Sequence, residues 1–274
     1  MENSILGKTT VYRDQYDASL LFPIARSLNR EKIGVHGALP FVGCDFWNHY
    51  EVSWLDGRGK PIAAIAEFDY DCDSPYLIES KSMKLYFNSF NNTKIDHVGQ
   101  LERMIQQDIG SRIHADLRLR IIPLGQFPED KIHVGFAGEC IDHLAIDVTD
   151  YQLNAAYLTT ESDAIVSETL SSNLLKSNCL VTGQPDWGSV SIEYRGRKLC
   201  REGLLRYIVS YRNMHEFSET GIERIFMDIM CHCAPEELTV YGRFTRRGGL
   251  DINPIRSTSI QKTQSVVMSR FCRQ

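Results

Sequence analysis

The sequence predicts an α+β protein in which paired helices lie on one face of an antiparallel sheet. Short runs in which apolar and polar residues alternate are typical of half-buried strands, and longer runs place apolar residues at helical spacing. The order strands, helix, helix, strand occurs twice along the 274 residues. The strict alternation of strand and helix that builds a doubly wound parallel sheet is absent.

The first copy of this pattern begins with a predicted β-hairpin. Apolar residues alternate on both sides of the turn Asp56-Gly57-Arg58-Gly59, whose composition favours a tight reversal of the chain. Two amphipathic helices and one strand follow the hairpin. The predicted strands cover 52–54, 62–68 and 117–121, and the predicted helices cover 83–90 and 98–109.

The second copy has the same order and contains the strongest amphipathic helix pattern of the chain. Thr220 and Glu223 have the spacing of a capping box at the start of that helix. The predicted strands cover 190–194 and 238–244, and the predicted helices cover 204–209 and 222–233. Gly, Asp and Ser interrupt the apolar runs between 125 and 175, so we expect a junction there and two domains, 1–150 and 151–274.

Composition excludes several classes of protein. Hydrophobic residues make up 43% of the chain, enough to form a core, and the formal net charge is −5. A mildly acidic chain does not hold nucleic acid through a global positive field. No stretch approaches the ~18 apolar residues of a membrane span, and the first residues lack the apolar core of a signal peptide. We therefore expect a cytoplasmic protein with no membrane and no direct nucleic-acid partner.

Eight cysteines are many for a cytoplasmic chain, in which disulfides are rare. The group Cys231-His232-Cys233 has no second ligand pair at zinc-site spacing, so we expect no metal site. Neither a Rossmann fingerprint nor a nucleophile elbow occurs, because the required glycines and serine are not present at the required spacing. A nucleotide would therefore have to be bound by a less common device.

Two segments have a composition that packing alone does not explain. Glu79-Ser80-Lys81 lies at the start of a predicted helix, where free backbone N–H groups favour anions; a solvated helix start is the alternative. Cys179 lies in a polar loop seven residues before Asp186. A nearby proton acceptor would help a thiol with a pKa of about 8.5 to attack as the thiolate. An ordinary turn with a half-buried cysteine explains the second segment equally well.

Two further segments carry charged residues beside turns. Residues 214–219 lead into the strongest predicted helix. A glutamate here can accept paired hydrogen bonds from an amidine-like edge such as that of guanine, or it can cap the helix. Three arginines within 243–247 stand beside Gly248-Gly249 and predict an anion site, because arginine binds phosphate bidentately. An RNA-binding patch and a charged edge strand are the alternatives.

Taken together, the four segments resemble the NADPH-dependent 7-cyano-7-deazaguanine reductases, the nitrile reductase family of queuosine biosynthesis, in its long two-part form. The resemblance extends over nearly the whole chain, through 27–30, 39–45 and 138–142 to Arg-Arg-Gly-Gly at 246–249. It implies tandem tunnelling-fold (T-fold) domains, of which the first carries the Glu-Ser-Lys motif and the second the nucleophilic cysteine. It also implies a homodimer, because sites in this fold commonly lie between domains or subunits.

The resemblance implies a role for each matching residue. Cys179 would add to the nitrile carbon and form a covalent thioimide, with Asp186 as the proton shuttle. Glu219 would hold the deazaguanine base. The other implied contacts are Ile78, Glu79, Ser80 and Ser218 with the substrate, and Ser80, Lys81, Arg247 and Gly248 with NADPH. The implied reaction reduces the free base 7-cyano-7-deazaguanine to 7-aminomethyl-7-deazaguanine with two NADPH, so that the enzyme does not contact tRNA.

Ser218 departs from the family pattern, which usually has a histidine beside the substrate-binding glutamate, and Met214 likewise replaces a common histidine. Serine can hydrogen-bond but cannot exchange a proton near neutrality. If that histidine is a general acid or base, its loss would slow turnover by roughly 10²–10⁴-fold. His215 would replace it only if this segment is helical.

Three functions therefore remain open at the level of sequence. The first is a working reductase, slower if the histidine that Ser218 replaces is a general acid or base and unimpaired if that histidine only positions the substrate. The second is a non-catalytic or impaired purine- or pterin-binding T-fold module, which the Ser218 departure permits. The third is a zinc cyclohydrolase of related fold, which should carry Cys and His ligands; no such ligand set is apparent in the sequence.

Overall fold

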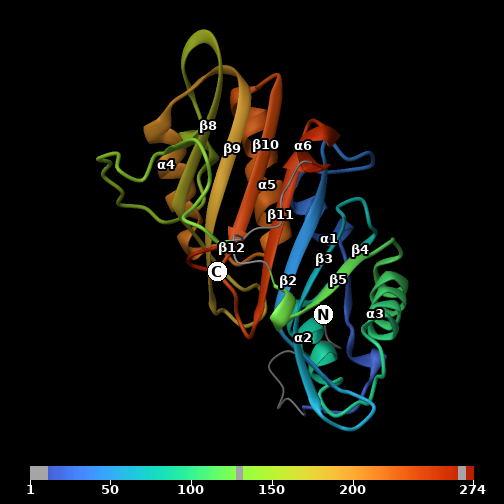
Figure 1. The fold of residues 1–274 in the computed structure, drawn as a ribbon. Coiled ribbons are helices and arrows are strands. Elements are labelled where there is room, and N and C mark those ends of the chain that lie inside the picture. Colours follow the sequence, from blue (N-terminus) through green and yellow to red (C-terminus); the bar gives the residue numbers. More distant parts are fainter. Residues whose placement is uncertain (1–11, 128–131, 265–269) are drawn as a thin grey trace.

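The computed structural model describes residues 12–127, 132–264 and 270–274. Eight strands form one sheet, which runs through the whole molecule (Figure 1). Every neighbouring pair is antiparallel except the last, β7 with β8. The order of strands is β5 (Arg118–Pro123), β3 (Pro61–Asp71), β2 (Val42–Leu55), β11 (Leu250–Ser257), β10 (Glu237–Phe244), β9 (Pro185–Leu199), β8 (Thr160–Asn178) and β7 (Glu139–Cys140).

Helices pack against this sheet and bury two apolar clusters. One cluster lies between β2, β3 and the helices Ser80–Asn88 and Val98–Ile113, around Trp47 and Phe87. The other lies between β9, β10 and the helices Arg201–Ser210 and Ser218–Cys233, around Ile192 and Phe226. The helices are α1 (Ser27–Arg30), α2 (Ser80–Asn88), α3 (Val98–Ile113), α4 (Arg201–Ser210), α5 (Ser218–Cys233) and α6 (Ile260–Gln264). This mixed α+β architecture with one large antiparallel sheet confirms the predicted class.

Two short strand pairs lie outside the large sheet. One pairs β1 (Pro23–Ala25) with β4 (Tyr76–Ile78) in antiparallel register. The other pairs β6 (Ile132–His133) with β12 (Arg270–Phe271) in parallel register. The first pair matters for the site described below, because β4 leads directly into α2.

The predicted hairpin is confirmed as β2 and β3. Asp56 closes the turn, since its carboxylate accepts hydrogen bonds of 2.9 Å from the backbone N–H groups of Arg58 and Lys60. Gly59 has a φ of +84° in the left-handed region, which glycine adopts without a steric penalty. The predicted helices and the strands β5, β9 and β10 are also present.

Two of the long strands are missing from the sequence prediction, β8 and β11. The first part of β8 is polar and exposed, so it lacks the alternation that marks a half-buried strand, and it occupies the segment expected to be a junction. β11 contains Pro254, which is normally excluded from central strands. The hydrogen-bonded register with β10 ends at Ile255, so Pro254 lies where β11 pairs with β2 alone.

The capping-box prediction is also wrong. Helix α5 begins at Ser218 with Phe217 as its N-cap, three residues before the cap expected at Thr220. Thr220 and Glu223 are consequently buried inside the helix. Glu223 has a different function there, as one member of a buried ionic network.

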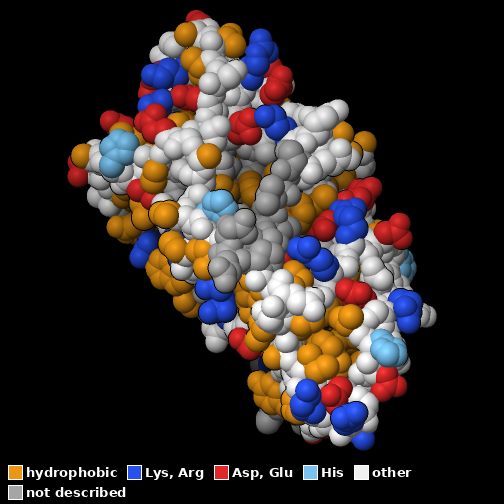
Figure 2. Space-filling model, in the orientation of Figure 1, with side chains coloured by type: hydrophobic (Ala, Val, Ile, Leu, Met, Phe, Trp, Pro, Cys, Tyr) orange, Lys and Arg blue, Asp and Glu red, His pale blue; other side chains and the backbone are white. Residues whose placement is uncertain are grey.

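The surface carries charges of both signs. Figure 2 shows Lys and Arg side chains interspersed with Asp and Glu on the face in view, in agreement with a formal net charge of only −5. Among the described residues, no helix is long and apolar enough to cross a membrane.

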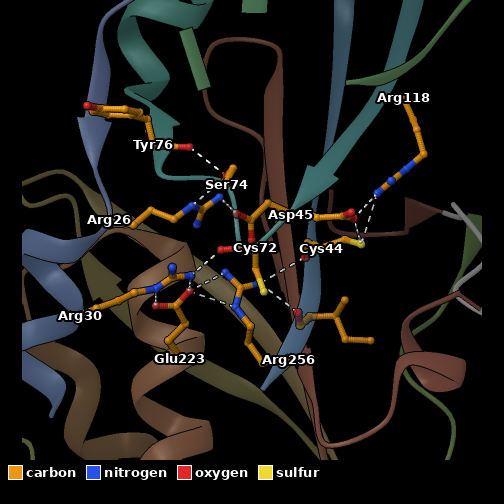
Figure 3. Close-up of polar contacts among 12 residues, drawn as sticks. Arg26, Arg30, Cys44, Asp45, Cys72, Ser74, Tyr76, Arg118, Glu223 and Arg256 are labelled. Atoms are coloured by element: carbon orange, nitrogen blue, oxygen red, sulfur yellow. Dashed lines mark hydrogen bonds and ion pairs between the residues drawn. The ribbon is translucent and has the colours of Figure 1, made fainter. Parts of the chain in front are cut away.

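Five buried side chains form an arginine–carboxylate network that joins α1, β2, β11 and α5 (Figure 3). Arg256 lies between two carboxylates, 2.8 Å from Asp45 and 2.9 Å from Glu223. Arg26 contacts the other oxygen of Asp45 at 2.5 Å. Arg30 donates two hydrogen bonds to Glu223, of 2.7 and 3.0 Å. The network therefore links segments that lie about two hundred residues apart in the chain.

The electrostatics of the network favour the ionised carboxylates. Burial raises the pKa of Asp45 and of Glu223, but in both cases the nearby arginines, Arg256 first, outweigh it and lower the pKa. Removing one partner of such a pair leaves a buried charge with less compensation, which is strongly destabilising.

We predict that Arg256→Met lowers the free energy of unfolding by about 3–5 kcal/mol, because it removes the cation shared by Asp45 and Glu223. Urea denaturation followed by circular dichroism measures the change. The matched control is Arg195→Met, since Arg195 pairs with Glu236 on the exposed surface, where a pair contributes at most ~1 kcal/mol. Equal losses in both variants would contradict the importance of the network.

Candidate active site

The β8–β9 hairpin positions Cys179 and Asp186. Cys179 follows the last residue of β8, and Asp186 is the second residue of β9, opposite Ser177. The turn is closed by two backbone hydrogen bonds, from Cys179 N–H to Gln184 O at 2.8 Å and from Gly183 N–H to Cys179 O at 3.0 Å. Both side chains line the same hollow, which is described below.

The environment of Cys179 favours the thiolate. Burial by itself raises the pKa of this thiol. Hydrogen bonds from the Thr182 hydroxyl, from the N–H groups of Thr182 and Val181 and from Arg247 outweigh burial, so that the pKa lies below its ordinary value. Cys44 shows the opposite case, because burial and the neighbouring Asp71 raise its pKa far above the ordinary value. Of these two thiols, only Cys179 is prepared for nucleophilic attack.

The pKa of Asp186 is shifted in the direction opposite to that of Cys179. Burial raises the pKa of its carboxyl group, and the positive charges of Arg247, Lys84 and Lys176 offset only part of this effect. A thiol with a lowered pKa and a carboxyl with a raised pKa lie closer together in acidity than the free groups do. Proton exchange between Cys179 and Asp186 is therefore less uphill than between an ordinary thiol and carboxylate.

Arg247 connects the cysteine loop to Asp186. It donates hydrogen bonds to Thr182 Oγ1 at 3.2 Å and Gln184 Oε1 at 2.8 Å, and it lies 3.2 Å from the Asp186 carboxylate. Its position is set by the tight β10–β11 turn, in which Gly248 and Gly249 both have positive φ. A side chain at Gly248 would also crowd Lys84 Cδ, at 3.2 Å.

Helix α2 contributes Ser80 and Lys84 from one face, one turn apart. Glu79 is the N-cap of this helix, since its carboxylate accepts hydrogen bonds of 2.8 Å from the N–H groups of Lys81 and Ser82. Lys84 is mostly buried, and burial followed by the charge of Arg247 lowers its pKa to about 8. Lys84 on α2 and Arg247 in the β10–β11 turn thus bring two cations to the site, which favours an anionic ligand.

Helix α5 contributes Ser218 and Glu219 from its first turn. Glu219 is 2% exposed, and its Oε1 has no hydrogen-bond partner among the described residues. Burial and the charge of Asp45 raise the pKa of Glu219 to about 8, against the opposing effect of Arg26 and Arg256. The carboxylate of Glu216 is not free to bind a ligand in the same way, because Arg224 donates hydrogen bonds of 2.6 and 3.0 Å to it.

These elements surround one partly open hollow, which is lined by residues of β2, α2, α5 and the β8–β9 and β10–β11 turns. It brings together seven of the residues singled out in the sequence: Ile78, Ser80, Cys179, Asp186, Ser218, Glu219 and Arg247. Glu79, Lys81 and Gly248 do not line it. In the parts of the chain that the structure describes, no group of three His, Cys, Asp or Glu side chains could hold a metal ion.

Sequence reasoning missed Lys84 and Trp47, which also line the hollow. The signal for Lys84 was available, since it follows Ser80 by four residues and such residues share a helix face. Trp47 gave no comparable signal, because in the sequence it is one of several apolar residues of β2.

Comparison with known proteins identifies the family. Residues 12–121 match the family described as "Nitrile reductase, 7-cyano-7-deazaguanine-reductase N-term". Residues 185–263 match the family described as "QueF-like protein". A Chromobacterium violaceum protein named NADPH-dependent 7-cyano-7-deazaguanine reductase is 55% identical over 93% of this chain and 92% of its own length. The chain belongs to the 7-cyano-7-deazaguanine reductase family.

Other reductases of this family are similar over almost the full chain. The Legionella pneumophila protein of the same name is 51% identical, over 93% of this chain and 90% of its own length. The Acidovorax ebreus protein is 49% identical, over 95% of both chains. Among solved structures, the archaeosine synthase QueF-Like in the apo form matches 36% of this chain and 99% of its own, with a TM-score of 0.31 and 20% identity.

Proposed function

We propose that this chain reduces the nitrile of 7-cyano-7-deazaguanine to the amine of 7-aminomethyl-7-deazaguanine with two NADPH, in queuosine biosynthesis. Membership of the reductase family and the names of the curated relatives support this reaction. The structural observation that carries it is a thiol of lowered pKa, Cys179, beside a carboxyl of raised pKa, Asp186. Both line one hollow with Glu219.

Glu219 holds the substrate base in this proposal. The amidine-like edge of a deazaguanine offers adjacent N–H donors, and a carboxylate can accept them as a pair. The unpartnered Oε1 of Glu219 supports this assignment. Ile78, Ser80 and Ser218 line the same hollow as further substrate contacts. Glu79 acts indirectly, because as N-cap it fixes the start of α2 and thus the position of Ser80.

Cys179 performs the first chemical step. Its sulfur forms a bond to the nitrile carbon, the thiol proton passes to Asp186, and Asp186 supplies a proton to the nitrile nitrogen as the thioimide forms. The hydrogen bonds that stabilise the thiolate support this role.

The residues of the hollow fit an anionic dinucleotide cofactor. Lys84 and Arg247 lie close enough for each to affect the other electrostatically, and a polyanion would relieve their repulsion. We assign Ser80, Lys81, Lys84, Arg247 and Gly248 to NADPH, with Gly248 acting through the turn that presents Arg247. When bound, the cofactor supplies one hydride at each of two reductions.

Cys179 and Asp186 also act between the two reductions. Asp186, reprotonated from solvent, supplies the second nitrogen proton as the thioimide is reduced to a thioaminal. The carbon–sulfur bond then breaks, its electron pair returns to Cys179, and one nitrogen proton returns to Asp186. An imine remains in the hollow, where Glu219 retains its base. The second reduction converts this imine to the amine, and Cys179 is ready for the next nitrile.

Ser218 limits the acid–base capacity of the site. His215 does not replace the missing imidazole, because residues 214–217 precede α5 and His215 is exposed outside the hollow. Asp186 therefore carries the proton transfers in this chain. A purine-binding T-fold module without turnover is the alternative that Ser218 favours.

The repeated order of elements supports tandem T-fold domains with a boundary near 150. If only strands of the large sheet are considered, two strands, two helices and a strand occur within 42–123, and two strands, two helices and two strands within 160–257. Within the described residues, the sheet ends at β5 on one side, and β7 covers only Leu170 and Ser171 of β8 on the other. Such open edges favour pairing with a second copy, so we propose a homodimer.

The proposed chemistry also favours a cytoplasmic location, since Cys179 must remain a free thiol and reducing compartments preserve thiols. All eight cysteines are unpaired. The mildly acidic net charge of −5 supports action on the free base, without direct contact with nucleic acid.

We predict nitrile-dependent oxidation of two NADPH per substrate, measured as absorbance loss at the nicotinamide band. Cys179→Ala should abolish it, because the nitrile then has no nucleophile. Cys231→Ala, which changes an exposed thiol, is the matched control and should retain the rate. If the unmodified chain binds the nitrile tightly but does not oxidise NADPH, the result would instead support the alternative of a non-catalytic binding module.

Glu219 generates a prediction about pH. With a pKa of about 8 in the free protein, the carboxyl is protonated near neutrality, and donors on the base favour its ionised form. Binding should therefore release one proton, and the Kd should fall as pH rises from 6 to 8, by up to about tenfold per unit. Calorimetry of Cys179→Ala with the nitrile measures both effects. A Kd independent of pH, or equal slopes with and without Glu219→Gln, would contradict this role of Glu219.

A further inference from the structure

A second residue that lines the hollow has a polar atom without a partner in the described part of the chain. This atom is Nε1 of Trp47, on β2. Trp47 is completely buried, and its ring stacks on Phe68 and Tyr70 at centroid distances of 5.8 and 6.4 Å. The first such residue is Glu219, through its Oε1.

Packing does not account for the indole N–H. The indole nitrogen only donates hydrogen bonds, and a buried donor without an acceptor is destabilising. Phenylalanine would fill an apolar position between two aromatic rings without that penalty. Trp54 lies on the same strand in the same apolar cluster, yet its nitrogen is not among the buried unpartnered atoms.

The two unpartnered atoms are chemically complementary to one kind of ligand edge. Glu219 offers an acceptor and Trp47 offers a donor, and both residues line the same hollow. A ligand satisfies both if it carries N–H donors next to an acceptor oxygen. The six-membered ring of a deazaguanine has this arrangement, because its lactam N–H and exocyclic amino group adjoin a carbonyl oxygen.

We propose that Trp47 is a specificity-determining residue that donates its indole N–H to the lactam carbonyl oxygen of the substrate, while Glu219 accepts from the adjacent N–H groups. This assignment rests on the proposed function and extends it to the choice between bases. A ring with an amino group in place of the carbonyl would bring a donor against the indole N–H, and such a mismatch discriminates strongly.

The position of Trp47 suits this task. β2 is hydrogen-bonded on both sides, to β3 and to β11, and Trp47 lies opposite Phe68 and Ile252. The indole therefore has little freedom to turn away when the hollow is empty. A donor fixed in advance loses little entropy on binding.

Equilibrium binding in the Cys179→Ala background tests the proposal without covalent capture. Trp47→Phe should raise the Kd for 7-cyano-7-deazaguanine roughly 10- to 100-fold, because the carbonyl oxygen is left without its donor. The matched control Trp54→Phe removes an indole from the same strand outside the hollow and should leave the Kd unchanged. For an analogue that lacks the carbonyl oxygen, Trp47→Phe should cause no loss of affinity.

A second measurement keeps the proposal testable if Trp47→Phe does not fold. The chain has three tryptophans, so ¹⁵N-labelled indole gives three N–H signals, which Trp54→Phe and Trp187→Phe assign by elimination. The Trp47 signal should move downfield with 7-cyano-7-deazaguanine and should not do so with the analogue that lacks the carbonyl.

The outcomes separate this proposal from the proposed function. If the nitrile binds normally, Trp47→Phe has no effect and the Trp47 signal does not move, the role of Trp47 alone is overturned. An ordered water then satisfies the indole N–H. Absence of nitrile binding to the otherwise unchanged Cys179→Ala chain overturns both proposals.

Discussion

The position of Arg256 between Asp45 and Glu223 is the constraint on which the site depends. Arg256 joins β11 to β2 and α5. Arg30, on α1, and Arg26, the residue before α1, add positive charge beside the same two carboxylates. Glu219 lies one turn before Glu223 on α5 and experiences the charges of the same network. An arrangement that fixes the fold across distant segments thus also fixes the orientation and acidity of the carboxyl that faces the hollow.

Burial by itself raises the pKa of Cys179, Asp186 and Glu219, and the surrounding hydrogen bonds and charges decide whether each pKa ends above or below its ordinary value. Cys179 receives hydrogen bonds from its own loop and from Arg247, so its pKa falls despite burial. Asp186 and Glu219 lack sufficient compensation, so their pKa values rise. A thiol of lowered pKa beside a carboxyl of raised pKa suits addition to a nitrile, which needs a nucleophile and a proton together.

Local patterns predicted much of the fold and part of the site. The β2–β3 hairpin and α5 followed from apolar spacing, and the loop context of Cys179 directed attention to Asp186. β8 was not predicted because its first part is polar and exposed. β11 was not predicted because it contains Pro254, which the strand tolerates because the hydrogen-bonded pairing with β10 has ended there. The arginine–carboxylate network depends on contacts between distant segments, which spacing along the chain does not encode. Lys84, in contrast, could have been inferred from its position four residues after Ser80 on the same helix face.

The central claim is that Cys179 forms a covalent bond to the nitrile. Intact-protein mass spectrometry after mixing the chain with 7-cyano-7-deazaguanine, without NADPH, tests it most directly. We expect a mass increase equal to one nitrile molecule, located on the peptide that contains Cys179, and its disappearance on addition of NADPH. Folded protein that binds the nitrile but shows no mass increase, or an increase located on an exposed cysteine such as Cys140, would contradict the claim.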